Sequence, residues 1–180
     1  MSDSTTDGPG ALPVLRPLNV PWMLSPSGPG LKATCVEEPW ACQVTAYALF
    51  GPLAGTYLKD ENTEDPGYHL IRVEFVRSGW SRFSPIFAER DPIQRAQYDW
   101  SQVPFRGPVD MTTDWRGEYN RAWLSNGACP DSGAYEVLGS PWAQEPRVAR
   151  FGLRHFILVG HDAYVEVLAM DWKWSLAPRE

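Results

Sequence analysis

Apolar and polar residues alternate with a period of two along much of the chain, as expected for β-strands that bury one face. The clearest case is Tyr68–Arg77, whose apolar face carries His69, Ile71, Val73 and Phe75. Shorter runs of the same kind predict strands at Trp80–Phe87, Ala134–Leu138, Leu153–Val159 and Ala163–Trp174. Pro85 interrupts the first of these shorter runs, and proline cannot donate to a ladder. We therefore expect Trp80–Phe87 to be an edge strand.

The block Lys32–Tyr57 allows two interpretations. Gln43–Phe50 alternates as a strand would, with Val44, Ala46, Ala48 and Phe50 on one face. Pro39 also suits the first position of a helix, and an apolar stripe follows it at helical spacing. We prefer the strand, and Gly51-Pro52 ends either element.

Two segments have the spacing of helices. Asp91-Pro92 has the form of an N-cap followed by proline at the first helical position, and an apolar stripe then runs to Trp100. A second helix is predicted from Thr112 or Thr113 to Asn126, where Asn126-Gly127 supplies a C-terminal stop. Both helices fall between the two halves of the predicted strands.

Residues 1–30 are rich in proline, glycine and serine. Because proline fixes φ and lacks a donor, this stretch is predicted to be an extended or partly disordered arm. Met1–Gly10 is expected to be loose, whereas the apolar residues of Leu12–Leu24 favour an extended path over the domain surface. Residues 31–180 are predicted to form a single globular domain.

Together these patterns predict an α+β fold. An antiparallel sheet of roughly five or six strands would carry two short helices and the extended N-terminal arm. A strongly curved or barrel-like sheet around an aromatic cavity is one form that this architecture allows.

The two C-terminal runs predict a β-hairpin whose register depends on its turn. A type II′ turn has glycine at its first central position, so Gly160-His161 fits and places His155 opposite Glu166. A turn centred on His161-Asp162 shifts the pairing by two residues and places His155 opposite Leu168. We prefer the first register.

Glu166 is the most unusual residue of this hairpin. A continuous strand over Ala163–Trp174 places its carboxylate on the same face as Tyr164, Trp172 and Trp174. An isolated buried charge is strongly unfavourable, so this carboxylate needs a partner, a hydrogen bond or a raised pKa.

Two hypotheses account for that position. In the first, Glu166 and His155 form a general acid–base couple assisted by Tyr164, while Trp172 and Trp174 line a binding cavity. In the second, Glu166 and His155 form a half-exposed cross-strand ion pair, which contributes about 0.2–1 kcal/mol.

The second predicted helix carries a charged face. Asp114 and Glu118 lie one turn apart and can share a cation or a basic partner, and Arg121 is placed to pair with Glu118. We treat these three residues as a candidate partner surface, although a run of charges on a helix is commonly only solvated.

Composition narrows the classes of partner. The 180 residues carry a formal charge of −6 with acidic and basic residues interspersed, so no basic face for nucleic acid is expected. No apolar stretch approaches the roughly 18 residues of a membrane span, and no signal peptide is recognisable. We expect a soluble cytoplasmic protein, and the composition is typical of GC-rich bacterial genomes.

The sequence contains no recognisable motif for a metal or a cofactor. The histidines lack close spacing and the cysteines form no C-x-x-C, so we predict no metal site and no cofactor. A Cys35–Cys42 bridge fits the spacing, but without an export signal we expect free buried thiols. Cys129 is expected to be unreactive, and Leu138–Pro141 is interpreted as a turn without chemistry.

Two functions remain open. The first is a non-catalytic binding protein whose acidic, aromatic-bearing surface neutralises a basic protein partner. Exposed acids at Asp60–Asp65 and Asp110–Glu118 motivate it. The alternative is a small enzyme or small-molecule binder of bacterial specialised metabolism. It would hold an apolar molecule in an aromatic-lined sheet cavity beside His155 and Glu166.

Overall fold

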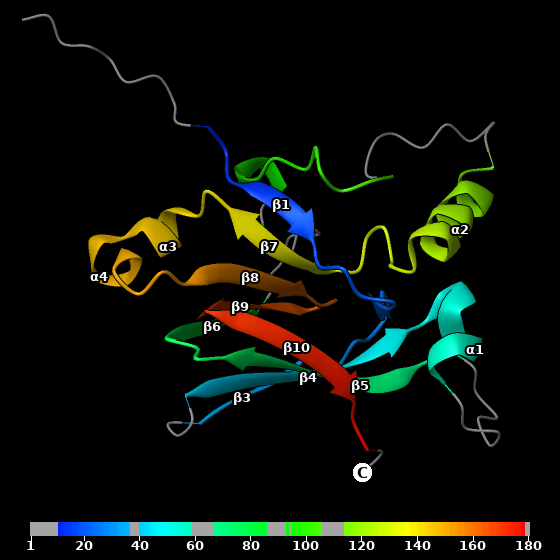
Figure 1. The fold of residues 1–180 in the computed structure, drawn as a ribbon, viewed down its shortest axis with the longest axis horizontal. Helices are drawn as coiled ribbons and strands as arrows, with labels where there is room; N and C mark the ends of the chain where they lie inside the picture. The colour runs from blue at the N-terminus through cyan, green and yellow to red at the C-terminus, as the bar shows by residue number, and fades with distance from the viewer. Residues whose placement is uncertain are drawn as a thin grey trace, which may run out of the picture.

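The structure is a computed structural model that describes residues 11–36, 40–58, 67–85, 93, 95–105 and 114–178. These residues form two antiparallel sheets (Figure 1). Sheet A has the order β1 (Val14–Pro17), β7 (Ala134–Leu138), β8 (Arg154–Val159), β9 (Ala163–Ala169) and β6 (Trp80–Pro85). Sheet B has the order β10 (Asp171–Leu176), β5 (His69–Val76), β4 (Ala41–Leu49) and β2 (Met23–Leu24), and β3 (Lys32–Val36) also pairs with β4. Sheet B is strongly curled, as half of a barrel would be.

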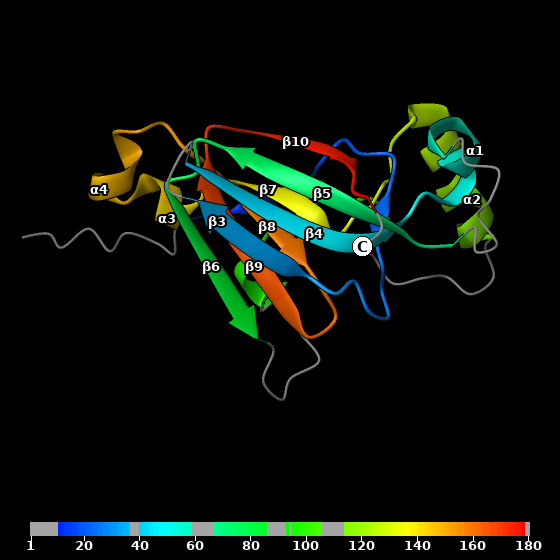
Figure 2. The same cartoon turned by 90° about the horizontal axis from the view of Figure 1, so that it is seen from below.

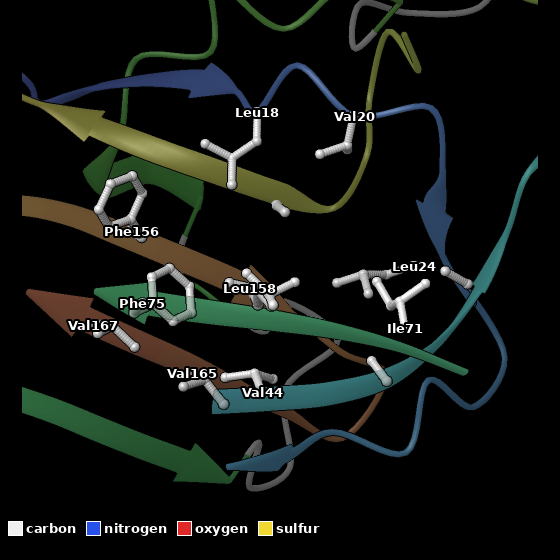
Figure 3. Close-up of a cluster of buried hydrophobic side chains, with 14 of the residues drawn as sticks. Leu18, Val20, Leu24, Val44, Ile71, Phe75, Phe156, Leu158, Val165 and Val167 are labelled. Atoms are coloured by element: carbon white, nitrogen blue, oxygen red, sulfur yellow. The ribbon is translucent and has the colours of Figure 1, made fainter. Parts of the chain in front are cut away.

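The main core lies between the two sheets. Sheet B contributes Val44, Ile71 and Phe75, and sheet A contributes Phe156 and Val167, all fully buried (Figure 3). Alternate residues of these strands point into this layer, as the period-two pattern predicts. The α+β prediction is therefore confirmed, including the strong curvature of a sheet.

Most predicted strands are confirmed. The alternating run in the ambiguous block is strand β4, so the helix interpretation of that block is wrong. The run at Trp80 is an edge strand, as the proline predicts. Alternation identified β4 and β5 because each has one face that is continuously buried.

The prediction of one strand over Ala163–Trp174 is wrong. The chain leaves sheet A after Ala169, bends at Met170 and enters sheet B as β10. The two strands have different burial: β9 is covered on both faces, whereas β10 is an edge strand that alternates between exposed and half-buried residues. The whole run is apolar enough to be read as one strand, but its two parts belong to different sheets.

The preferred hairpin register is also wrong, and the alternative is confirmed. His155 lies opposite Leu168, and Ile157 lies opposite Glu166. The Gly160 amide donates to the Ala163 carbonyl at 2.8 Å, which leaves His161 and Asp162 as the turn. Position 160 requires glycine because its neighbours are too close for a side chain. A Cβ there would lie 2.9 Å from the Leu31 side chain and 2.8 Å from the Ala163 oxygen.

The N-terminal segment is extended, as predicted, but it does not lie over the surface. Strand β1 pairs with β7 and strand β2 pairs with β4, so the segment joins both sheets. Leu15, Val20 and Trp22 have no exposed surface. Met1–Gly10 lies outside the described residues. Leu18 and Leu24 are also buried, so most of the apolar residues among the prolines belong to the core, whereas Leu12 is half exposed.

The described residues contain four α-helices: α1 (Ala54–Tyr57), α2 (Trp115–Asn126), α3 (Pro141–Gln144) and α4 (Pro146–Ala149). Helix α2 ends at Gly127 with φ of 65°, as its glycine predicts. The other predicted helix, Asp91–Trp100, is wrong in its described part, which holds only a 3-10 turn at Arg95–Gln97. Asp91-Pro92 and Thr112-Thr113 lie outside the described residues. No described helix has the length and apolar character needed to span a membrane.

A buried acid and its arginine partner link strands of both sheets. The carboxylate of Glu136 on β7 accepts hydrogen bonds from Nε and Nη2 of Arg154 on β8, each at 2.8 Å. Arg16 on β1 donates to the same carboxylate, and Arg154 Nη1 lies 3.6 Å from Asp171 Oδ1 on β10. The hydrogen bonds from Arg154, followed by those from Arg16, hold the pKa of Glu136 below its usual range against the opposing effect of burial.

Candidate functional site

His155 and Glu166 meet on the outer face of sheet A, away from the core between the sheets. They lie on adjacent strands, and His155 Nε2 is 3.3 Å from Glu166 Oε1. The shift of two residues in register makes this contact diagonal but keeps both side chains on one face. Both residues are buried, with 4% and 7% of their surface exposed. The distance suits an ion pair, but Nε2 has no aligned hydrogen-bond partner among the described residues, so we treat the contact as electrostatic.

Ser140 completes this group on the other side of the imidazole. Its Oγ lies 2.8 Å from His155 Nδ1 and accepts the Ala143 amide at 3.2 Å. The hydroxyl and the imidazole nitrogen share one hydrogen bond, whose direction depends on the tautomer of His155. Ser140, His155 and Glu166 are called the outer-face cluster below.

Sequence reasoning dismissed Ser140 as part of a turn. The available signal was Ser140-Pro141, since serine at the N-cap and proline at the first position are typical of a helix start. This is what the structure contains: Ser140 is the N-cap of α3.

Aromatic side chains enclose the outer-face cluster. The Trp142 ring meets the His155 ring edge-on at 5.2 Å between centroids, and the guanidinium of Arg82 stacks 3.6 Å over Trp142. Arg82 also lies opposite Glu166 in the β6–β9 ladder. Burial raises the pKa of the Tyr98 hydroxyl to about 12, and the negative charges of Glu166 and Tyr164 add to that shift. Tyr164 lies two residues before Glu166 on β9 and packs against the cluster that contains Leu15 and Ile157.

Trp172 and Trp174 are not part of this group. They lie on β10 in sheet B and pack against the core between the sheets. The Trp174 ring is 6.2 Å from Trp22 and 5.9 Å from Phe50. The predicted cavity that joins these tryptophans to Glu166 is therefore wrong, because the break at Met170 moves them to the other sheet.

The outer-face cluster is closed to a substrate in this conformation. Each of its three residues is at least nine-tenths buried, and Leu168 and Trp142 pack over it with Val148. The Ser140 oxygen is engaged by the backbone of α3. The acid–base role of His155, Glu166 and Tyr164 stays a prediction. The burial favours a structural role, in which the cluster attaches α3 to sheet A.

Replacing Ser140 with alanine is expected to lower the free energy of unfolding by about 1–2 kcal/mol. The change removes the N-cap bond of α3 and leaves buried His155 Nδ1 without its partner. Urea denaturation followed by tryptophan fluorescence measures the effect. Ser125→Ala removes an exposed hydroxyl on α2 and should change stability by less than about 0.5 kcal/mol. Equal effects of the two variants would contradict the role given to Ser140.

A groove opens at the seam where the edge of sheet B meets the edge of sheet A. Strand β3 lies beside β6 there (Figure 2), and Cys35 Sγ on β3 is 3.2 Å from Ser81 Oγ on β6. The groove has a volume of about 600 Å³. Its apolar lining consists of Val36, Trp40, Trp80, Phe151, Leu153 and Met170. We call it the seam groove.

The seam groove leaves large apolar side chains exposed to solvent. Trp40 is 65% exposed, and Phe151 and Met170 are nearly half exposed. Trp80 and Phe151 have ring centroids 5.8 Å apart and form one wall. A second hollow of about 670 Å³ lies over the outer face of sheet B, but Lys32, Thr34, Gln43, Thr45 and Arg72 make its lining more polar than that of the seam groove. The seam groove is therefore the better site for an apolar group.

Arg77 stands at the rim of the seam groove. It is the one charged residue among the described residues that line the groove, and within the described ranges it forms no ion pair. Its Nη1 lies 3.8 Å from the Met170 sulfur. Its backbone has a positive φ of 51° at the crossing from β5 to β6. Apart from this contact to Met170, the guanidinium has donors that no described residue is seen to use, next to an apolar surface.

Comparisons with known proteins add no relative. The chain matches no protein-family model, and neither the curated proteins nor the solved structures give a match. The inference of function therefore rests on the geometry of the seam groove and the outer-face cluster.

Asp114, Glu118 and Arg121 lie far from both sites. Helix α2 is at the opposite end of the molecule from α3 and α4 (Figures 1 and 2). Asp114 is the N-cap of α2 and accepts the Gly117 amide at 3.1 Å. Arg121 Nη1 is 3.8 Å from Asp114 Oδ2, so its ion pair in the described residues is with Asp114, whereas the sequence suggested Glu118. The acids at Asp60–Asp65 lie outside the described residues.

The cysteines differ in their surroundings. Cys42 and Cys129 are buried, as predicted, but Cys35 is exposed in the seam groove, so the prediction of a buried thiol is wrong for it. Burial raises the pKa of the Cys129 thiol to about 12, which favours the unreactive role. Within the described ranges, no group of three or more His, Cys, Asp or Glu residues is placed to hold a metal ion.

Proposed function

We propose that the protein binds a small apolar molecule carrying an acidic group, and that the seam groove is its binding site. The apolar lining of the groove carries the proposal. Its volume of about 600 Å³ falls in the range of roughly 300–1,000 Å³ typical of small-molecule sites. A ligand that covers the exposed rings of Trp40 and Phe151 removes their apolar surface from water, which favours binding.

Arg77 is the reason for proposing that the ligand carries an acidic group. A cation at the rim of an apolar groove makes stronger hydrogen bonds to a carboxylate or sulfonate than to a neutral group. The neighbouring lining, including Met170, is apolar and offers Arg77 no counter-ion. A ligand with an apolar body and one anionic end satisfies both features of the groove.

Binding is favoured over acid–base catalysis because the histidine and the carboxylate of the outer-face cluster are not in the groove. The outer-face cluster lies behind Trp80 and Leu153, whose side chains pack on the layer formed by Trp142 and Leu168. The described lining offers one thiol, Cys35, and two hydroxyls, Ser78 and Ser81, with no histidine or carboxylate to act as a base.

The probe for this proposal is anilinonaphthalene sulfonate, an aromatic anion, compared with neutral phenylnaphthylamine. Trp40→Ala is expected to weaken binding of both probes about tenfold, because it removes an aromatic wall worth about 1.4 kcal/mol. Arg77→Gln is expected to weaken binding of the anion about tenfold while leaving the neutral probe unchanged. Fluorescence titration of the folded full chain measures both.

Tyr47→Ala is the matched control. Tyr47 is also a large exposed aromatic residue, at 48%, but it lies over the outer face of sheet B. Its replacement should leave both titrations unchanged, and near-ultraviolet circular dichroism should show that each variant retains native packing. Equal loss of binding in the Tyr47 and Trp40 variants, or no loss in the Trp40 variant, would refute the seam groove as the site.

The neutralisation of a basic protein stays a second proposal, and it rests on the acidic charge of the chain. The described acids of α2 alternate with Arg116 and Arg121, so that helix is not a uniformly acidic surface. A salt-sensitive complex with a basic protein, recovered by pull-down from the native cell, would support it.

A further inference from the structure

Cys35 and Cys42 face each other across neighbouring strands. They are directly paired in the β3–β4 ladder, and their sulfur atoms are 2.8 Å apart. Directly opposed residues of an antiparallel pair have Cα atoms about 4.5–5.5 Å apart. That range lies inside the roughly 4.4–6.8 Å seen across disulfides. A bond between the two sulfurs therefore needs a small side-chain movement and no shift of the backbone.

The two thiols differ in access. Cys35 is exposed and lines the seam groove, whereas Cys42 has no exposed surface and belongs to the core between the sheets. Burial, with Cys35 as the next cause, raises the pKa of the Cys42 thiol to about 12. A reagent from solution therefore meets Cys35 first, and Cys42 lies directly behind it.

We propose that Cys35 and Cys42 form a dithiol–disulfide site that reacts with small-molecule disulfides, with Cys35 attacking and Cys42 resolving. This proposal is independent of the ligand proposed for the groove. It uses the groove only as the route by which a disulfide of the glutathione type reaches Cys35.

The reaction is thiol–disulfide exchange in two steps. The Cys35 thiolate attacks one sulfur of the reagent, forming a mixed disulfide and releasing the first small thiol, which takes up the proton lost by Cys35. The Cys42 sulfur then attacks the Cys35 sulfur, closes the protein disulfide and releases the second small thiol with the proton from Cys42. The reagent gains two electrons and the protein loses two, so one reagent molecule yields two thiols.

Bond formation also changes the seam. The Cys35 sulfur now contacts Ser81 Oγ on β6 at 3.2 Å, and this contact joins the edge of sheet B to the edge of sheet A. A bond to Cys42 on β4 would instead hold the Cys35 sulfur on sheet B. The geometry thus couples the oxidation state of the pair to one wall of the groove.

The test incubates the reduced, folded full chain with oxidised glutathione, then denatures it in acid and alkylates the remaining thiols. The chain has three free cysteines, and the count is expected to fall from three to one. Peptide mapping should recover Cys35 linked to Cys42. In Cys42→Ala the resolving thiol is missing, so a glutathione adduct should accumulate on Cys35. In Cys35→Ala, Cys42 should stay unmodified because it is buried.

Cys129→Ala is the matched control, since it removes a buried thiol outside the pair and should leave the Cys35–Cys42 link unchanged. A variant that loses its native circular dichroism is replaced by the corresponding serine variant. Retention of three thiols in the folded wild type, a link that includes Cys129, or a Cys42→Ala chain without an adduct on Cys35 would each overturn the proposal.

Discussion

Replacing Trp22 with alanine is expected to lower the free energy of unfolding by about 4 kcal/mol, the middle of the range for a buried aromatic residue. The Trp22 side chain has no exposed surface and lies in the core between the sheets, where its ring meets Trp174 edge-on at 6.2 Å. Its indole nitrogen has no hydrogen-bond partner among the described residues, so the loss is one of packing. Urea denaturation monitored by far-ultraviolet circular dichroism measures it.

Two variants bracket this result. Trp22→Phe keeps most of the apolar volume and should lower the free energy of unfolding by only about 1–2 kcal/mol. Trp40→Ala removes an exposed indole and should change it by less than about 0.5 kcal/mol. If Trp22→Ala were as mild as Trp40→Ala, the N-terminal segment would not be part of the core.

The second large effect is expected at Glu136. Glu136→Ala should lower the free energy of unfolding by about 3 kcal/mol, because it leaves Arg16 and Arg154 without the carboxylate that both of them bind. This value is at the lower end for a buried pair, since both guanidinium groups are partly exposed. Glu74→Ala is the matched control: it breaks an exposed pair with Lys173 and should lower the free energy of unfolding by less than about 1 kcal/mol.

The same carboxylate predicts a pH dependence. The pKa of Glu136 in the folded chain is below its ordinary value of 4.5. The stabilisation from its ionised form is therefore complete above about pH 4.5 and is lost as the pH falls through the lower, folded-state pKa. Glu136→Gln should accordingly have a shallower loss of stability below pH 4.5 than the wild type. Parallel curves for the two proteins, from urea titrations at stepped pH, would contradict this assignment.

The sequence was most informative for strands that bury one face, and least informative for a run that passes from one sheet to the other. β5 was recognised from the alternation of His69, Ile71, Val73 and Phe75, all of which are buried. The run after Ala163 was not resolved into two strands. Alternation reports which side chains are buried and does not report which sheet buries them.

The candidate site was predicted in part. His155 and Glu166 come together in either hairpin register, because a shift of two residues preserves the face of each side chain. Ser140 was missed because Ser140-Pro141 was interpreted as a turn, and Arg82 was missed because it lies on β6, which is distant in the sequence. The seam groove was missed for the same reason: Val36, Trp80 and Met170 lie on separate segments and share no motif.

The pairing of β1 with β7 has a consequence for biosynthesis. Arg16 and Glu136, which face each other in this pair, are 120 residues apart. At a translation rate of about 5–20 residues per second, the partner strand is made roughly 6–24 s after β1. During that interval β1, which carries the buried Leu15, lacks its partner strand β7, so it is available to chaperones and to association with other chains. Refolding of the complete chain has no such delay, although it still carries the entropic cost of closing this long loop.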